Sequence, residues 1–134
     1  MKSDEAIKTD LYKMIMGSDL QLSINGVVKK TRRPHRSTKE DIVISVLVND
    51  ISQIQTISAN VNIFVPDKVV NGQPEEDTIR CRELSQLAYN LFKVFYTDEY
   101  RGELISQRVM ENDTSEENPE HFINNKLEIK INNE

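Results

Sequence analysis

The residues of this chain whose types suit acid–base or metal chemistry are few and scattered. The two histidines, His35 and His121, have no cysteine or second histidine at the short spacings that bind zinc. The single cysteine, Cys81, has no histidine near it in the sequence, which favours a packing role over a nucleophilic one. The sequence therefore predicts no metal site, no cofactor and no catalytic residue.

Paired acids and phosphate-binding loops give no stronger signal. Glu40-Asp41 and the acids of Glu75–Asp77 stand where a strand and a helix are expected to begin, so capping and solvation account for them. The four glycines are isolated, whereas a phosphate-binding loop needs several close together. A nuclease or other hydrolase would need a metal site that these residues do not assemble. We expect a protein that is not an enzyme.

Charge is strongly segregated along the chain. The segment Lys29–Lys39 (KKTRRPHRSTK), called here the basic loop, holds six of the 17 lysines and arginines, one histidine and no acid. The rest of the chain has 11 basic residues against all 22 acids, a net charge of −11. Pro34 excludes a regular helix or strand interior, which predicts an extended, mobile loop between two strands.

The basic loop has three readings that the sequence leaves open. It contacts phosphate, it contacts an acidic protein surface, or it is simply solvated. Because no aromatic residues are interleaved with its cations, sequence-specific nucleic-acid recognition is not expected. The candidate interaction residues of this loop are Lys29, Lys30, Arg32, Arg33, His35 and Arg36.

A second charged segment, Glu111–Glu120, contains five acids, no base and one proline, and predicts an exposed acidic loop. In a head-to-tail ring, this loop of one subunit could meet the basic loop of the next and fix their orientation. Assembly would then weaken when salt rises or when Arg32, Arg33 and Arg36 are changed to glutamate.

The elements that must position these loops centre on Asp41–Pro66. Two β-rich runs, Ile42–Val48 and Ile57–Val65, flank a polar stretch and predict a long antiparallel hairpin. The first run is aliphatic on one face and mostly so on the other, as in a strand covered on both sides. The second has an apolar face and a polar face. Asn60 and Asn62, on that polar face, are further candidate interaction residues.

The remaining chain predicts two helices and three more strands around this hairpin. Ser3–Met16 has a serine N-cap, an apolar stripe and Gly17 as its stop, and Thr78 to Phe95 or Tyr96 forms the second helix and the expected lid over the hairpin. Pro66–Asp77 reads as a loop with a turn at Asn71-Gly72. The strands are expected at Leu20–Val28, at Tyr100–Met110 and, as an edge strand, at Phe122–Ile131.

This order, α-β-β-β-α-β-β, predicts an α+β fold with a largely antiparallel or mixed sheet of about five strands and two helices packed on one face. The length fits a single domain covering residues 1–134. A hydrophobic content of 37% is modest, which suggests that neighbouring subunits contribute to stability. No signal peptide and no membrane span are apparent, so a soluble protein of a reducing compartment is expected.

One stretch resembles a family of phage proteins. The segments NGVVKKTRRPHRSTKEDIVISVLVN and QIQTISANVNIFVPD are similar to the tail-completion and tail-terminator group of neck proteins in tailed phages. The similar features are Gly26-Val27 at a strand end, Arg33-Pro34 in the following loop, Glu40–Val43 opening the central strand and Asn60–Pro66 closing the hairpin. The motif match covers residues 25–67. Ile57-Ser58 stands where a glycine would be expected.

The resemblance implies a sheet backed by two helices and assembled into a six-fold or twelve-fold ring at the head–tail junction. Members of this family cap the tail tube or join it to the portal complex. In such rings the long hairpin and nearby loops contact neighbouring subunits and the tube. This places the basic loop and Asn49–Gln55 at interfaces, and adds Asp50, Gln53 and Gln55 to the candidate interaction residues.

The resemblance thus implies a structural virion protein of a phage neck or tail, made in the host bacterial cytoplasm. Its expected partners are other copies of itself and adjacent tail-tube or portal and connector proteins, with no membrane; a passive contact with passing DNA remains open. The alternative is a small nucleic-acid-binding accessory protein that uses the basic loop. The net charge of −11 outside that loop weighs against this alternative, because it would repel DNA over most of the surface.

Overall fold

The chain forms an α+β fold in which three helices pack against a mixed six-stranded sheet. The computed structural model describes residues 1–113 and 118–132. The sheet order is β1-β2-β3-β8-β7-β6, with β1 and β2 parallel and every other pair antiparallel. The elements are α1 (Asp4–Ile15), α2 (Asp19–Ser23), β1 (Val28–Lys29), β2 (Ile42–Asp50), β3 (Ile54–Pro66), β4 (Lys68–Val70), β5 (Gln73–Glu75), α3 (Thr78–Phe92), β6 (Val94–Tyr96), β7 (Tyr100–Glu111) and β8 (Glu120–Asn132).

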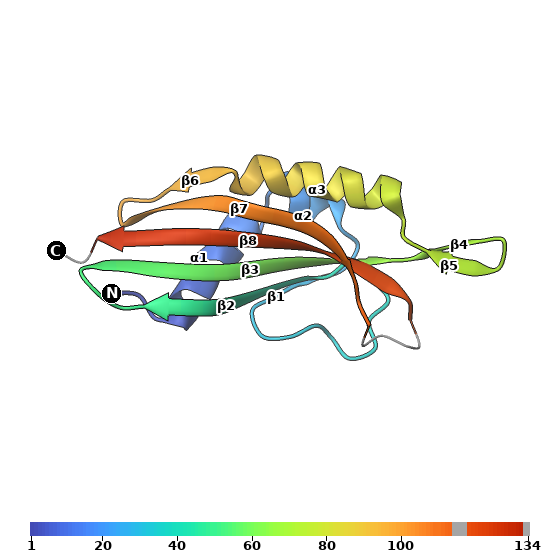
Figure 1. Ribbon diagram of the computed structural model, residues 1–134, viewed down its shortest axis with the longest axis horizontal. Helices are drawn as coiled ribbons and strands as arrows, with labels where there is room; N and C mark the ends of the chain where they lie inside the picture. Colours follow the sequence, from blue (N-terminus) through green and yellow to red (C-terminus); the bar gives the residue numbers. More distant parts are fainter. Residues whose placement is uncertain (114–117, 133–134) are drawn as a thin grey trace.

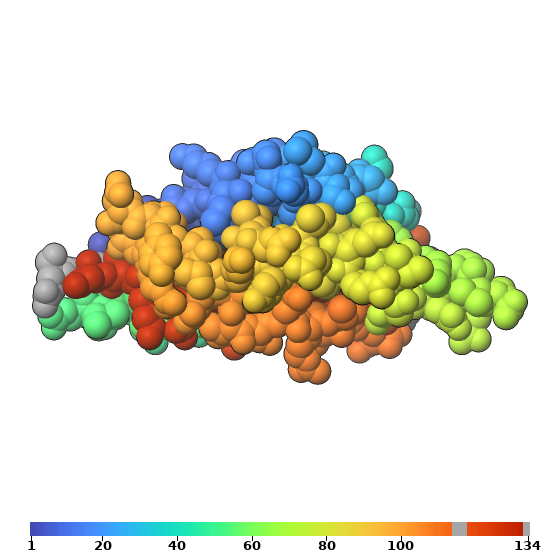
Figure 2. All heavy atoms as spheres, turned by 90° about the horizontal axis from the view of Figure 1, so that it is seen from above, coloured from blue at the N-terminus to red at the C-terminus, as the bar shows by residue number. Residues whose placement is uncertain are grey.

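The predicted α+β class is confirmed, with six strands in the main sheet instead of about five and three helices instead of two among the described residues. All three helices lie on one side of the curled sheet (Figure 1). From above, α1 and α2 lie beside α3 on the same side (Figure 2). The opposite side of the sheet carries no helix among the described residues.

The core lies between the helices and the inner face of the sheet. Alternate residues of β3 and β8 supply its floor, and every position from Ile57 to Val65 in steps of two is buried. From α1, Ile7, Leu11 and Ile15 pack into it, as the predicted stripe required. The helix starts as expected, because the Ser3 hydroxyl accepts a hydrogen bond from the Ala6 N–H at 3.2 Å.

The predicted hairpin is confirmed as β2 and β3, which pair antiparallel from Ile42–Ile63 to Asp50–Thr56. Two details of the prediction were wrong. The outer face of β2 is not covered, and the side chain of Leu47 is 55% exposed at a bulge. The expected cover of the hairpin is shared between two helices, because α1 packs on β2 while α3 packs on β7, β8 and β3.

The segment Leu20–Val28 was predicted as a strand, but it begins within the helix α2 and continues as a loop up to Val28. Ser18 caps the short helix α2 by accepting a hydrogen bond from the Gln21 N–H, and only Val28 and Lys29 pair with β2. Leu20 is buried while Leu22, on the opposite side of the short helix, is exposed. Alternating leucines fit both a strand and one turn of helix, so the cap decided the outcome.

The last strand was predicted at an edge and lies in the centre. β8 pairs with β3 along its whole length and with β7 on its other side. The half-buried Glu128 and the exposed Lys130, whose charges suggested an edge, instead face the helix-free side of the sheet. Alternation of polar and apolar residues indicates that one face of a strand is solvated, but it does not indicate that the backbone of the strand is unpaired.

The second predicted helix ends earlier than expected. Asp77 caps α3, with its carboxylate accepting from the Arg80 N–H at 3.1 Å, but the helix stops at Phe92. The following Val94–Tyr96 forms β6, so the apolar run belonged to two elements. Ile79, in the first turn of α3, and Val94, just after its end, are exposed.

The segment Pro66–Asp77, predicted as a loop, contains a small separate hairpin. β4 and β5 pair antiparallel, and the expected turn at Asn71-Gly72 is confirmed with φ values of 52° and 77°. This hairpin projects from one end of the molecule, opposite the turn between β2 and β3 (Figures 1 and 2). Among the described residues, no helix is long and apolar enough to span a membrane.

Candidate interaction surfaces

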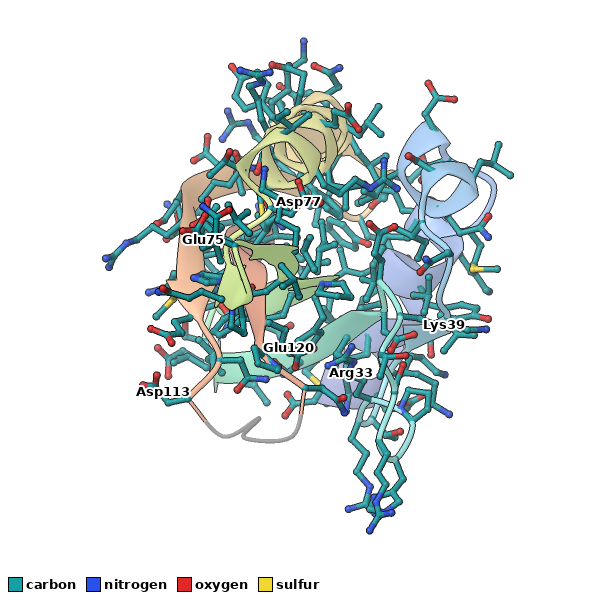
Figure 3. The ribbon with its side chains drawn as sticks, turned by 90° about the vertical axis from the view of Figure 1, so that its right-hand side faces the viewer. Arg33, Lys39, Glu75, Asp77, Asp113 and Glu120 are labelled. Carbon is teal, nitrogen blue, oxygen red and sulfur yellow. The ribbon has the colours of Figure 1, made fainter. Side chains whose placement is uncertain are left out.

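The basic loop is anchored by Arg33, which points inward. Its guanidinium group donates from Nε to Asp41 at 2.9 Å and from Nη1 to the Glu120 carboxylate. The Asp41 and Glu120 side chains are 2% and 3% exposed. Arg33 also donates to the Lys39 carbonyl and lies 4.5 Å from the Phe64 ring centroid. Figure 3 shows Arg33 between Glu120 and Lys39.

Asp41 collects further donors beside Arg33. Its Oδ1 accepts the Val27 N–H at 2.9 Å, and its Oδ2 accepts the Ser37 hydroxyl. Burial alone would raise the pKa of Asp41, but the hydrogen bonds from Ser37, Val27 and Arg33 outweigh it and hold this pKa below its ordinary value. The carboxylate therefore stays charged and fixes the loop at both ends.

A second buried pair continues this network toward α3. Arg80 donates to both oxygens of the Glu40 carboxylate, at 2.6 and 2.8 Å, and to the Ser23 carbonyl at 2.6 Å. Hydrogen bonds to Glu40 raise the pKa of Arg80, so this guanidinium is always charged. The adjacent acids Glu40 and Asp41, expected to be solvated at a strand start, instead hold α3 and the basic loop to the sheet.

Arg33 of the basic loop pairs with Glu120 of the predicted acidic loop, so neither is available for the predicted contact between subunits. Glu120, expected in the exposed acidic loop, is buried, and the pair forms within one chain. Glu111 ends β7, and residues 114–117 of the acidic loop lie outside the described residues. The predicted mobility of the basic loop is also wrong near Lys30 and Arg33, because Lys30 bonds Glu5 and Thr9 of α1.

The other predicted residues of the basic loop are exposed. Lys29, Arg32, His35 and Arg36 have exposed side chains and make no ion pair with the described residues. Together with Lys39 they form a patch of cations, and in Figure 3 several loop side chains end in nitrogen well away from the sheet. The structure brings these residues together as one surface and separates Arg33 from them.

The predicted residues around the β2–β3 turn also divide into exposed residues and a buried one. Asp50 and Gln53 are exposed, but Gln55 is fully buried and exchanges hydrogen bonds with the Lys2 backbone and Asn49. Gln55 therefore fastens the N-terminal segment and is not available to a partner. Its position, two residues before the buried Ile57, already placed it on the inner face.

Asn60 and Asn62 lie on the helix-free face of the sheet, as their alternation indicated. Asn62 accepts a hydrogen bond from Asn124 at 2.8 Å, while the Asn60 Oδ1 is buried without a partner among the described residues. The strand register aligns polar and basic residues around them in two rows, Ser45, Asn60, Lys126, Ser106 and Val43, Asn62, Asn124, Arg108. Around Asn60 and Asn62 this face is mostly polar and mildly cationic.

An exposed apolar cluster at the β2–β3 turn was missed by the sequence reasoning. Leu47, Val48, Ile51 and Ile54 have side chains 55%, 45%, 62% and 56% exposed. We call these four residues the apolar tip. Ile51 and Ile54 flank a short turn, and isoleucine is not a residue that favours turns. Their presence there was the sequence signal that could have revealed the apolar tip.

The edge of β2 beside the apolar tip is also open. β1 pairs only with Ile42 and Val43, so β2 has no strand partner on this side from Ile44 to Asp50 among the described residues. Such an edge offers backbone donors and acceptors to another strand. The apolar tip and this edge form a continuous candidate protein interface.

Residues suited to chemistry remain apart in the fold. No group of three or more His, Cys, Asp and Glu side chains within residues 1–113 and 118–132 is arranged to hold a metal ion. His121 lies 2.7 Å from Asp67, and Cys81 is buried in the core. Burial raises the pKa of the Cys81 thiol to about 12.

No protein-family model matches this chain, and no curated protein matches it either.

Proposed function

We propose that this chain is a structural virion protein of a phage neck or tail, forming a ring that terminates the tail tube or joins it to the head connector. The proposal starts from the resemblance over residues 25–67, which places the hairpin and its turn at subunit contacts. Its mechanism is geometric, because a closed ring offers a matching symmetric platform to its neighbours.

The apolar tip is the observation that carries the proposal. Four exposed aliphatic side chains at the end of one hairpin are unusual on a protein that stays alone, and such patches mark contact sites. The open edge of β2 next to them can add a strand from another subunit. Both features fall at the segment that the resemblance assigns to interfaces.

Head-to-tail contact suits the distribution of these surfaces. The apolar tip lies at one end of the elongated molecule, and the β4–β5 hairpin projects from the other (Figure 1). A contact between two different patches repeats from copy to copy and closes into a ring when the rotation allows. The salt-sensitive pairing of basic and acidic loops would have to use Arg32 and Arg36, because Arg33 is already engaged.

The test is the mass of the purified protein in solution by light scattering. We expect a six-fold or twelve-fold mass for the natural chain and a monomer for the variant Ile51→Asp/Ile54→Asp. The matched control is Leu22→Asp/Ile79→Asp, which places the same charges at exposed aliphatic residues of α2 and α3.

The control is expected to keep the mass of the natural chain. An assembled tip variant would refute the role of the apolar tip. A natural chain that stays monomeric at millimolar concentration, and that does not bind tail-tube or connector rings, would refute the proposed function.

A further inference from the structure

The basic loop borders an open cavity whose lining is suited to an anion. Its volume is about 480 Å³, and it is lined by Lys29, Thr31, Arg32, Arg33, Pro34 and His35. Three of these residues carry a permanent positive charge, a fourth is a histidine and a fifth offers a hydroxyl. No carboxylate lines it.

The cavity is held open by anchors on both sides of it. Lys30 bonds Glu5 and Thr9 on α1, and Arg33 bonds Asp41 and Glu120 on the sheet. These contacts fix the loop at two points, Lys30 and Arg33, which are three residues apart. A site that is ordered before its ligand arrives loses less entropy on binding.

The charge left over at this site is positive. Arg33 faces two buried carboxylates, which leaves that cluster one negative charge in excess. The side chains of Lys29, Arg32, Arg36 and Lys39 have no carboxylate partner among the described residues. Four unpaired cations against one excess carboxylate leave the loop and its anchor at a net charge of +3, on a chain whose formal charge is −5.

A second cavity continues the first along the loop. It has a volume of about 360 Å³, shares Pro34 with the first and includes Arg36 and Lys39 in its lining. Its one acid, Asp41, is already bonded to Arg33 and Ser37. Two adjoining cationic cavities suit an anion that repeats along a line better than a single small one.

We propose that the paired cavities of the basic loop bind consecutive phosphate groups of a nucleic-acid backbone. Arginine and lysine are the usual phosphate contacts, and they carry no sequence information when they touch only the backbone. An acidic protein surface fits less well, because Pro34 is the only apolar residue lining the first cavity, whereas the centres of protein interfaces are apolar. The site lies within one chain and does not depend on ring assembly.

The experiment measures binding of two labelled 20-base-pair DNA duplexes of different sequence by fluorescence anisotropy at several salt concentrations. We expect equal affinity for both sequences and a slope of log K against log salt of about −2, as for two phosphate contacts. The variant Lys29→Ala/Arg32→Ala is expected to bind about tenfold more weakly at low salt, with a slope reduced by about 1 or more.

The control variant is Arg82→Ala/Lys93→Ala, which removes the same charge from exposed positions on and just after α3. It is expected to keep the affinity of the natural chain to within twofold. Both variants should unfold at the same midpoint as the natural chain, because none of the four side chains loses an ion pair with the part of the chain that the structure describes. Equal weakening by both variants would show a general charge effect and overturn the proposal.

Two further probes separate the sources of the anion. Inorganic phosphate is followed by the NMR signals of His35, and polyglutamate is used as a competitor of DNA. Binding of phosphate at His35 without any DNA binding would overturn the nucleic-acid assignment and leave a site for free phosphate. Polyglutamate that competes as well as unlabelled DNA at equal charge would overturn the phosphate assignment in favour of an acidic protein.

Discussion

At the residue scale, Arg33 decides the conformation of the basic loop. The sequence presents six cations in eleven residues without distinguishing among them, and the structure gives one of them two buried carboxylate partners. The partners come from positions 41 and 120, so the second lies 87 residues away. A contact at that separation depends on how β8 joins the sheet, which no local pattern of residues encodes.

Replacing Arg33 by methionine is expected to lower the free energy of unfolding by about 3–5 kcal/mol, because Asp41 and Glu120 would remain buried without their cation. Urea denaturation followed by circular dichroism measures this change. The control Arg32→Met removes an exposed cation from the adjacent position and should change stability by less than about 0.5 kcal/mol. Equal effects of the two substitutions would contradict the anchoring role of Arg33.

The Cys81 thiol is expected to be unreactive in the folded protein. Burial raises its pKa to about 12, whereas an unfolded thiol has a pKa of about 8.5. The folded state therefore keeps a proton that the unfolded state loses, and stability should fall as pH rises above about 8.5. Labelling with a disulfide reagent at pH 8 should be slow in buffer and fast in urea; rapid labelling of the native protein would disprove this burial.

At the element scale, the predictions that held were those with a strong local signal. Helix α1, strands β2 and β3, the start of α3 and the turn at Asn71-Gly72 all followed from caps, periodicity or turn residues. Two of the predictions that failed required knowledge of neighbouring strands, whereas the helix α2 followed a local signal, its Ser18 cap. The position of β8 depends on its pairing with both β3 and β7. The end of α3 depends on β6 pairing with β7.

The candidate site was predictable to a similar extent. Charge segregation identified the basic loop, and alternation placed Asn60 and Asn62 on an exposed face. The same alternation places Gln55 on the buried face, whereas the resemblance, which assigns Asn49–Gln55 to interfaces as one stretch, made it a candidate. The apolar tip went unnoticed because a sequence search for function favours polar and charged residues, whereas exposed aliphatic residues are recognisable only once the fold shows them to be uncovered.

Gly26 is expected to be essential to the junction between α2 and β2. A Cβ atom at this position would overlap the Asp41 carboxylate and the Glu40 carbonyl, both of which are fixed by buried ion pairs. Gly26→Ala should therefore destabilise the protein by about 2 kcal/mol or more in urea denaturation.

The matched control for Gly26 is Gly17→Ala. Gly17 has a φ of 84° and open space around its Cβ direction, so alanine there should cost only about 1 kcal/mol of backbone strain. A Gly26→Ala variant as stable as Gly17→Ala would contradict this prediction, because it would show that the residues around Gly26 move at little cost in stability.

At the scale of the whole molecule, the two candidate surfaces differ in chemistry and in place. The apolar tip lies at one end of the sheet, while the basic loop hangs below its other half (Figure 1). Separate surfaces allow assembly and polyanion binding to be changed independently. They also respond to salt in opposite directions, because salt screens exposed charges and strengthens apolar contacts.

If the apolar tip drives assembly, the oligomer should persist between 0.1 and 1 M sodium chloride, because salt screens contacts between charges but does not weaken apolar contacts. The variant Arg32→Glu/Arg36→Glu should then keep its assembled mass in light scattering while losing DNA binding. Dissociation of the natural chain at high salt, together with a monomeric charge variant, would instead assign assembly to the pairing of basic and acidic loops.

The central place of β8 has a consequence for biosynthesis. Ribosomes make proteins from the N-terminus, so β3 and β7 emerge before the strand that joins them. Until Glu120–Asn132 leaves the exit tunnel, the edge of β3 that pairs with β8 has no strand partner, and Arg33 lacks its ion pair with Glu120. The sheet is complete only when β8 inserts between β3 and β7, and until then the unpaired edge of β3 is a site at which nascent chains can associate.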